Sequence, residues 1–185
     1  MKKLTVICGS PRSINESNTY AALNAEVDYF KKNNKDLEVA FHKLPVNLQG
    51  CINCKKCNLW CNIQDDFQKI LKDIETSDSI LLGSPVYLDM PTPQVVAFLT
   101  RLNCMAENSN REFFKGKDIY LLATGFCSGT KTCIHTMMGA CEMLGFNIPG
   151  RSTREYIVKW NDTKLRGGMR REDSIFIFIN KKEEE

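Results

Sequence analysis

Four cysteines stand close together in the middle third of the chain, at Cys51, Cys54, Cys57 and Cys61. Their spacing is C-x2-C-x2-C-x3-C. Thiolates separated by such short steps can bind the neighbouring irons of an iron–sulfur cluster. Four thiolates also suit tetrahedral zinc, and a thiol loop without metal can be redox-active. From the residues alone, all three chemistries remain open for this cysteine loop.

A second group of polar side chains follows the first apolar run of the chain, which extends from Leu4 to Cys8 and ends at Gly9. A helical pattern then begins near Asn18. The first amides of a helix have no partner inside it, and the helix dipole favours an anion there. Hydroxyl, amide and guanidinium groups fill the turn: Ser10, Arg12, Ser13, Asn15, Ser17, Asn18 and Thr19. The stretch predicts a site for a terminal monophosphate, with an ordinary capped strand-to-helix turn as the alternative.

Two common phosphate-binding loops are excluded by the sequence. The turn has a single glycine, Gly9, so the dinucleotide fingerprint G-x-G-x-x-G is absent. The run from Gly125 to Thr132 imitates G-x-x-x-x-G-K-[ST] with the wrong spacing. What remains is a loop of hydroxyl and amide groups, which suits a terminal monophosphate.

Apolar periodicity predicts alternating strands and helices along the chain. Strands are expected at 4–8, 37–42, 79–83, 118–124 and 146–148. Helices are expected at 18–33, at 95–102 and at 134–144. A further helix is expected to begin at Asp65 as its N-cap, with Gln68 completing a capping box. Such alternation predicts a parallel sheet covered by helices, with ligands beyond the carboxyl ends of its strands. Polar loops at 9–18, 84–90 and 125–130 would meet there, which favours a mononucleotide such as FMN.

Length and composition narrow the class of protein. The 185 residues fit one domain, and a net charge of +3 with both signs interspersed does not indicate nucleic acid binding. The chain has no apolar run long enough for a membrane span and no signal-peptide pattern, so a cytoplasmic protein is expected. Nine cysteines in such a chain favour metal or redox roles, although Cys8, Cys104, Cys133 and Cys141 fit buried apolar positions and Cys127 lies in a loop.

Three segments in order resemble the flavodoxin-like NAD(P)H-dependent FMN reductases, and among them the iron–sulfur flavoproteins. They are Gly9-Ser10-Pro11-Arg12 with Ser17-Asn18-Thr19, then Gly50-Cys51-Ile52-Asn53-Cys54-Lys55-Lys56-Cys57 with Asp65-Asp66-Phe67, and Gly83-Ser84-Pro85-Val86-Tyr87 followed by Ala97-Phe98-Leu99-x-Arg101. The resemblance covers residues 2–150 and implies an α/β flavodoxin-like, doubly wound five-stranded parallel sheet of order 2-1-3-4-5. It also implies FMN at the switch point and a homodimer or homotetramer.

The resemblance also assigns site residues by position. Ser10, Arg12, Ser17, Asn18 and Thr19 would hold the FMN phosphate, while Pro85, Val86, Tyr87, Thr124 and Gly125 would line the isoalloxazine ring. Cys51, Cys54, Cys57 and Cys61 would hold a [4Fe-4S] cluster, although the family's fourth cysteine usually follows a longer gap. The flavin carries the hydride chemistry, so no catalytic side chain is nominated. His42 and His135 are isolated and are interpreted as structural.

We therefore expect an FMN-binding domain at 1–150, including the cysteine-rich loop 44–64, and a C-terminal arm at 151–185. The arm ends in the apolar run 175–179, which suggests an oligomer contact. The leading function is an NAD(P)H-dependent FMN oxidoreductase with an unidentified electron acceptor. The alternatives are a flavodoxin-type carrier reduced by a ferredoxin-like protein, and a zinc or thiol regulatory domain without flavin.

Overall fold

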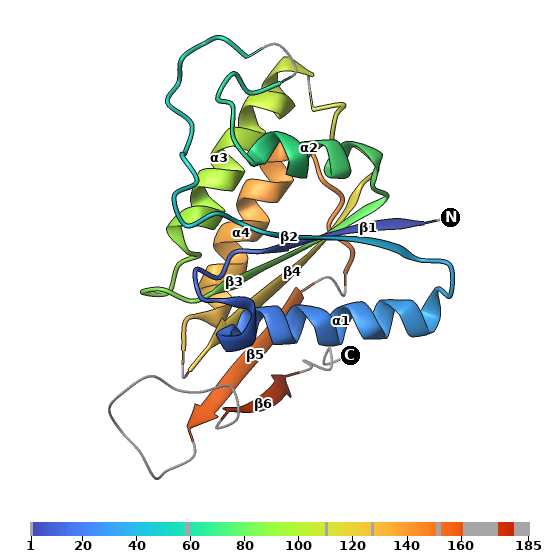
Figure 1. Ribbon diagram of the computed structural model, residues 1–185, viewed down its shortest axis with the longest axis vertical. Helices are drawn as coiled ribbons and strands as arrows, with labels where there is room; N and C mark the ends of the chain where they lie inside the picture. Colours follow the sequence, from blue (N-terminus) through green and yellow to red (C-terminus); the bar gives the residue numbers. More distant parts are fainter. Residues whose placement is uncertain are drawn as a thin grey trace.

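The computed structural model describes residues 2–57, 60–109, 111–126, 128–150, 153–160 and 174–179. Strands and helices alternate along it (Figure 1). The elements are β1 (Lys3–Cys8), a 3-10 turn η1 (Ile14–Glu16), α1 (Asn18–Asn33), β2 (Glu38–Lys43), α2 (Phe67–Thr76), β3 (Ser79–Pro85), α3 (Pro93–Asn108), β4 (Asp118–Gly125), α4 (Thr130–Leu144), β5 (Thr153–Trp160) and β6 (Ser174–Ile179).

These strands form one sheet in the order β2-β1-β3-β4-β5-β6. The first five strands in this order are parallel, and β6 runs antiparallel to β5. The predicted order 2-1-3-4-5 of a flavodoxin-like sheet is confirmed, and β6 extends it at one edge. Parallel pairing aligns Cys8 with Gly83 and Pro85 with Thr124. The carboxyl ends of β1, β3 and β4 therefore meet at one end of the molecule.

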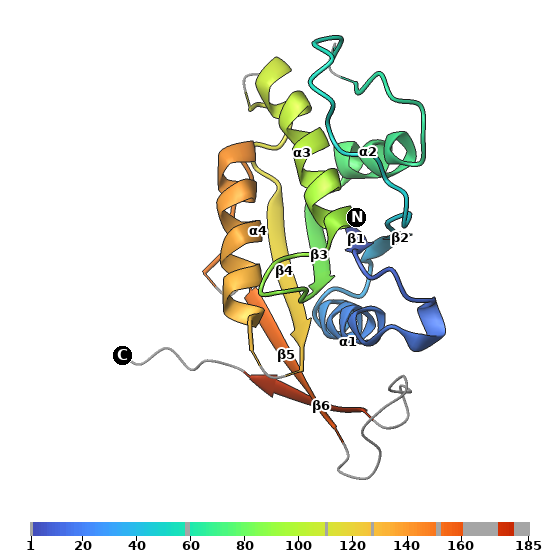
Figure 2. The same cartoon turned by 90° about the vertical axis from the view of Figure 1, so that its left-hand side faces the viewer.

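Helices cover the two faces of the sheet unequally. One face packs against α2, α3 and α4, whose buried side chains include Phe67, Phe98 and Met137. The other face packs against α1 through Ala22, Leu23 and Val27. Figure 2 shows α1 and α4 on opposite sides of the sheet. Within the described residues, no helix is both long and apolar enough to cross a membrane.

The fifth strand lies later in the sequence than predicted. Residues 146–148 contribute only an isolated bridge between Asn147 and Asp118, whereas β5 occupies Thr153–Trp160. Phe146 is buried in the core, with its ring centroid 4.5 Å from that of Phe114. Its apolar character therefore serves core packing at the end of α4. The pairing of β5 with β4 means that the sheet continues beyond residue 150.

The capping box predicted for α2 is not formed. The N-cap position is occupied by Asp66, while the Asp65 carboxylate accepts a hydrogen bond from the Phe67 amide at 3.2 Å. The Gln68 side chain donates to the carbonyl oxygens of Cys61 and Ile63. Gln68 thus fixes the end of the cysteine-rich loop to α2, because loop carbonyls compete for its amide.

Close approach of three elements requires a glycine at the end of β1. The Gly9 amide donates to the Gly83 carbonyl at 2.8 Å, and the Thr92 hydroxyl donates to the Gly9 carbonyl at 2.8 Å. A Cβ atom on Gly9 would lie 2.1 Å from Cγ2 of Val95. The absence of a side chain lets α3 begin directly against β1, beside the loops that follow the strands.

Candidate functional site

One cavity lies at the carboxyl ends of β1, β3 and β4. Its lining comes from the three loops that the sequence placed together: Ser10, Arg12, Asn18, Thr19, Pro85, Val86, Tyr87, Thr124, Gly125 and Phe126. Nine of these are residues predicted to bind FMN, and that role stays a prediction. The tenth predicted residue, Ser17, is buried and caps α1 by accepting from the Tyr20 amide at 3.1 Å. Phe126 was missed, although it directly follows Gly125.

The polar end of this cavity is the start of α1. The first intrahelical bond there joins the Ala21 amide to the Ser17 carbonyl at 3.1 Å. The amides of Asn18 and Thr19 precede that bond, so the helix leaves them for a ligand. Oδ1 of Asn18 is buried without a hydrogen-bond partner among the described residues. This amide oxygen can only accept, and a buried acceptor without a partner is costly, so the site favours a hydrogen-bond donor beside it.

The opposite wall of the cavity is built from the ends of β3 and β4. The Val86 amide donates to the Thr124 carbonyl at 2.9 Å. Tyr87 and Met90 then exchange backbone hydrogen bonds of 2.9 Å around a tight turn. Leu88 and Asp89 within it have φ values of 48° and 62°, in the left-handed region that non-glycine residues seldom adopt. This wall combines backbone groups with the half-exposed Tyr87 ring, as contact with a flat heterocycle requires.

The donor set fits FMN in its chemistry. Hydroxyls of Ser10 and Thr19, the Arg12 guanidinium and the amides at the start of α1 can hold a phosphate dianion. The wall at residues 85–87 can accept an apolar ring. Such a division between a polar end and an apolar wall is what a phosphorylated flavin needs.

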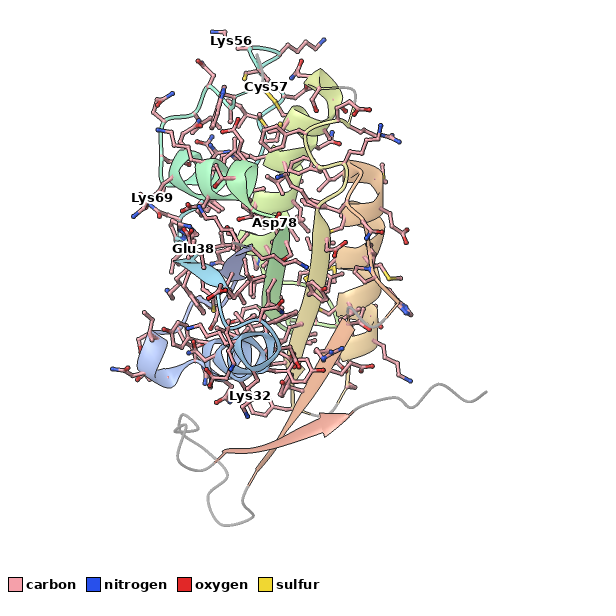
Figure 3. All side chains as sticks on the ribbon, turned by 90° about the vertical axis from the view of Figure 1, so that its right-hand side faces the viewer. Lys32, Glu38, Lys56, Cys57, Lys69 and Asp78 are labelled. Carbon is pink, nitrogen blue, oxygen red and sulfur yellow. A yellow bond between two sulfur atoms is a disulfide. The ribbon has the colours of Figure 1, made fainter. Side chains whose placement is uncertain are left out.

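The cysteine-rich loop lies elsewhere in the molecule. It follows β2 and runs along α3 toward the helix's carboxyl end (Figures 1 and 2). The Cys51 amide donates to the Thr100 hydroxyl at 3.4 Å, and Cys57 forms a disulfide with Cys104 one turn further along α3. Figure 3 shows Cys57 at the end of the molecule opposite β5 and β6. Cys104 is separated from Pro93, at the start of α3, by about 16 Å of helix.

The described residues do not bring the four predicted cysteine ligands together. Cys57 is bonded to Cys104, and Cys61 is buried in the apolar core beside α2. Within the described ranges, no three His, Cys, Asp or Glu side chains form a group that could hold a metal. In this form of the chain the thiols do not fit a [4Fe-4S] cluster. Cys104, expected to be an isolated buried thiol, is buried but has a covalent partner.

A buried arginine fixes both limbs of the cysteine-rich loop. The Arg101 side chain is fully buried on α3 and forms an ion pair with Asp65. It also donates to the carbonyls of Gln49 at 3.5 Å and Ile63 at 3.1 Å, and its guanidinium lies 4.1 Å from the centroid of the Phe67 ring. The sequence segment Ala97–Arg101 was noted only for its family resemblance. Its arginine ties the residues before Cys51 to those after Cys61.

Three other cysteines behave as buried apolar groups, as predicted. Burial raises the pKa of Cys8, and it raises the pKa of Cys133 and of Cys141 to about 12. These thiols stay protonated and unreactive near neutral pH. His42 also has a structural partner, because its Nε2 lies 2.8 Å from Oδ2 of Asp73.

Residues 2–154 match the model of the family described as NADPH-dependent FMN reductase. An iron–sulfur flavoprotein of Methanocaldococcus jannaschii is 33% identical over 102 residues, which cover 54% of this chain and 51% of the relative. An iron–sulfur flavoprotein of Archaeoglobus fulgidus is 30% identical over 100 residues, covering 54% of this chain and 48% of the relative. The chain thus spans about half the length of these curated relatives.

Solved structures with the same fold include one with a bound flavin phosphate and one named as an NADH:FMN oxidoreductase. RosB with bound 8-demethyl-8-formylriboflavin-5′-phosphate has a TM-score of 0.70 at 20% identity, over 85% of this chain and 65% of RosB. An NADH:FMN oxidoreductase, EMOB, in its apo form has a TM-score of 0.60 at 14% identity, over 86% of this chain and 76% of that one. At such identities the likeness shows the fold alone.

Proposed function

We propose that this chain, which belongs to the NADPH-dependent FMN reductase family, is an oxidoreductase that binds FMN in the cavity at the ends of β1, β3 and β4. The observation that carries the proposal is the meeting of three separate loops in that cavity. They supply phosphate-binding groups on one side and a ring-binding wall on the other. NADH or NADPH is the proposed electron donor, and the electron acceptor is not identified. The proposed location is the cytoplasm.

The chain's own residues bind and orient the cofactor in this proposal. Ser10, Arg12 and Thr19 hold the phosphate with the first amides of α1, while Val86 and Tyr87 face the ring. FMN supplies the redox chemistry when bound, since it accepts a hydride at N5 and releases electrons singly. The buried hydrogen bond of 2.6 Å between the Thr19 and Thr124 hydroxyls fixes the start of α1, on the phosphate side, relative to the end of β4, on the ring side.

An iron–sulfur cluster is proposed only for the reduced chain. The relatives' names and the cysteine spacing support a [4Fe-4S] cluster on Cys51, Cys54, Cys57 and Cys61. A cluster needs Cys57 as a free thiolate, whereas the structure has that sulfur bonded to Cys104. The alternatives for the cysteine-rich loop are a zinc ion or free thiols without a metal. The proposed assembly is a homodimer or a homotetramer.

The test uses the full chain, purified without oxygen and supplied with FMN. Flavin absorbance retained after gel filtration and steady oxidation of NADH or NADPH with an added acceptor are expected. Bound flavin without nicotinamide turnover would favour the alternative carrier, which a reduced ferredoxin would then reduce directly. Failure to bind FMN would overturn the proposal. Iron and sulfide analysis of the same sample tests the cluster separately.

A further inference from the structure

We propose that Cys57 and Cys104 form a redox-active thiol pair, whose disulfide withdraws Cys57 from the cysteine-rich loop and blocks metal loading there. The thiol chemistry stands on the structure alone. The effect on loading rests on the proposed cluster.

The two cysteines come from elements far apart in sequence. Cys57 lies on the loop after β2 and Cys104 on α3, 47 residues later, with their Cα atoms 6.5 Å apart. The Asn108 side chain donates to the Cys104 carbonyl at 2.8 Å and contacts its sulfur at 3.6 Å. These contacts fix Cys104 on the last turns of α3, so the loop brings Cys57 to a sulfur held in place.

The two sulfurs differ in their exposure to solvent, which assigns them different roles in the exchange. Cys57 is half-buried, whereas Cys104 is 7% exposed. Access favours Cys57 as the sulfur that meets a soluble oxidant, and Cys104 as the thiol that resolves the product.

The exchange balances with a low-molecular-weight disulfide such as oxidised glutathione. The Cys57 thiolate attacks one glutathione sulfur, forms a mixed disulfide and releases one glutathione thiolate. The Cys104 thiolate then attacks the Cys57 sulfur and releases the second glutathione. The protein loses two protons and two electrons, and the oxidant becomes two molecules of reduced glutathione.

The cysteine-rich loop is anchored on α3, so the disulfide changes which loop thiols are available to a metal. Arg101 binds carbonyls on both limbs of the loop, and the Cys51 amide already contacts α3 at Thr100. Bonding of Cys57 to the same helix closes the loop against α3 at a second position. A metal that requires the Cys57 thiolate then lacks one of its ligands, because a disulfide sulfur is no thiolate.

The experiment compares wild type with Cys104→Ser and Cys57→Ser, since both substitutions abolish the disulfide but only the second removes a loop thiol. Metal-free protein is incubated with oxidised or reduced glutathione, desalted and alkylated. Peptide mapping should find a Cys57–Cys104 linkage in oxidised wild type alone. The same samples then receive iron and sulfide without oxygen. Reduced wild type should load, oxidised wild type should load at least tenfold less, and Cys104→Ser should load after either treatment.

Each part of the proposal has its own contrary result. A different linkage, or none, in oxidised wild type overturns the thiol pair. If Cys104→Ser binds as little iron as Cys57→Ser, Cys104 is itself a metal ligand, and the blocking role of the disulfide is contradicted. A mapped linkage in a wild type that never binds iron leaves the pair standing, but refutes both the proposed cluster and the block. Far-ultraviolet circular dichroism and FMN binding of each variant exclude misfolding as the cause.

Discussion

The guanidinium of Arg101, fully buried on α3, forms an ion pair with the carboxylate of Asp65, which lies at the end of the cysteine-rich loop. Replacement by methionine in Arg101→Met keeps much of the side-chain volume but removes the charge and the donors to Gln49 and Ile63. We expect the free energy of unfolding to fall by about 3 kcal/mol, because a partly buried carboxylate and two carbonyls lose their partner. Urea denaturation measures the loss, and amide hydrogen exchange should locate it at residues 49–63.

An exposed ion pair provides the control for this substitution. Lys115 lies 3.0 Å from Glu112, and both side chains are more than half exposed. Lys115→Met should change stability by no more than about 0.5 kcal/mol. Equal effects of the two methionine substitutions would show that Arg101 does not anchor the loop.

Arg12 is expected to select FMN over riboflavin. Arg12→Ala should weaken FMN binding by about tenfold to a hundredfold, since a charge-assisted hydrogen bond contributes about 1.5–3 kcal/mol. Riboflavin lacks the phosphate, so its affinity should not change. Fluorescence titration with both flavins measures the discrimination. Lys31→Ala, at the opposite end of α1, removes the same charge and should leave both affinities unaltered; an unchanged FMN affinity in Arg12→Ala would take Arg12 out of the site.

Gly9 should not tolerate a methyl group. Gly9→Ala would place Cβ 2.1 Å from Val95 and 3.0 Å from the Gly83 carbonyl, where backbone cannot easily move. We expect a loss of about 1–3 kcal/mol in thermal or urea unfolding. Gly139→Ala is the matched control, because nothing lies within 4 Å of its added Cβ inside α4. That substitution should raise stability by about 0.5–1 kcal/mol, and a destabilised Gly139→Ala would contradict this account of the packing.

Asp73 should make stability depend on acid pH. The Lys3 ammonium, at 2.8 Å, is the main cause of a lowered Asp73 pKa, with His42 contributing on the other oxygen. A lowered folded-state pKa contributes stability above the unfolded value, about 3.9, and this contribution disappears as pH falls through the folded value. Asp73→Asn should therefore cost about 1 kcal/mol at pH 7 and progressively less below about pH 4.

Chemical denaturation at several pH values measures this difference. Asp28→Asn is the control, because Asp28 is exposed on α1 and has no ion-pair partner among the described residues. Its difference from wild type should be small at every pH. A cost of Asp73→Asn that persists undiminished at pH 3 would mean that its charge is not responsible.

Deletion of residues 174–185 tests the predicted oligomer contact. β6 is the edge strand beside β5, so its removal exposes the ladder of β5. If the C-terminal segment joins subunits, light scattering should report a smaller assembly. A shorter deletion of 180–185 leaves β6 in place and should keep the original mass. An unchanged mass after the longer deletion would refute the contact.

Local signals in the sequence predicted α1 well, whereas the strand order 2-1-3-4-5 was implied by the family resemblance. Apolar spacing predicted α1 at 18–33, which are its observed bounds, because that signal acts within one element. The rule that parallel strands end together predicted that three loops would meet, and the family resemblance then assigned the individual cavity residues. Ser17 fell outside that lining because its hydroxyl serves the Tyr20 amide.

The misplaced features depend on partners distant in sequence. An apolar residue such as Phe146 fits either a strand or a loop packed into the core. Its contact with Phe114, which is distant in sequence, places it in the core. The Asp65 carboxylate accepts from the Phe67 amide at the start of α2 through Oδ1, and through Oδ2 it pairs with Arg101, which lies 36 residues away. Likewise, periodicity placed Cys104 on the buried side of a helix but could not reveal Cys57 beside it. Such choices are made by tertiary contacts, which a local pattern does not contain.

The bond between Cys57 and Cys104 has a thermodynamic consequence for folding. It closes a covalent ring over 47 residues that contains all of α2 and β3. On the chain-entropy account, a ring of this size restricts the unfolded ensemble by about 4 kcal/mol at room temperature. Oxidation and folding are then linked equilibria, so each favours the other. The thiol redox poise of the surroundings would thus affect the free energy of unfolding as well as the state of the cysteines.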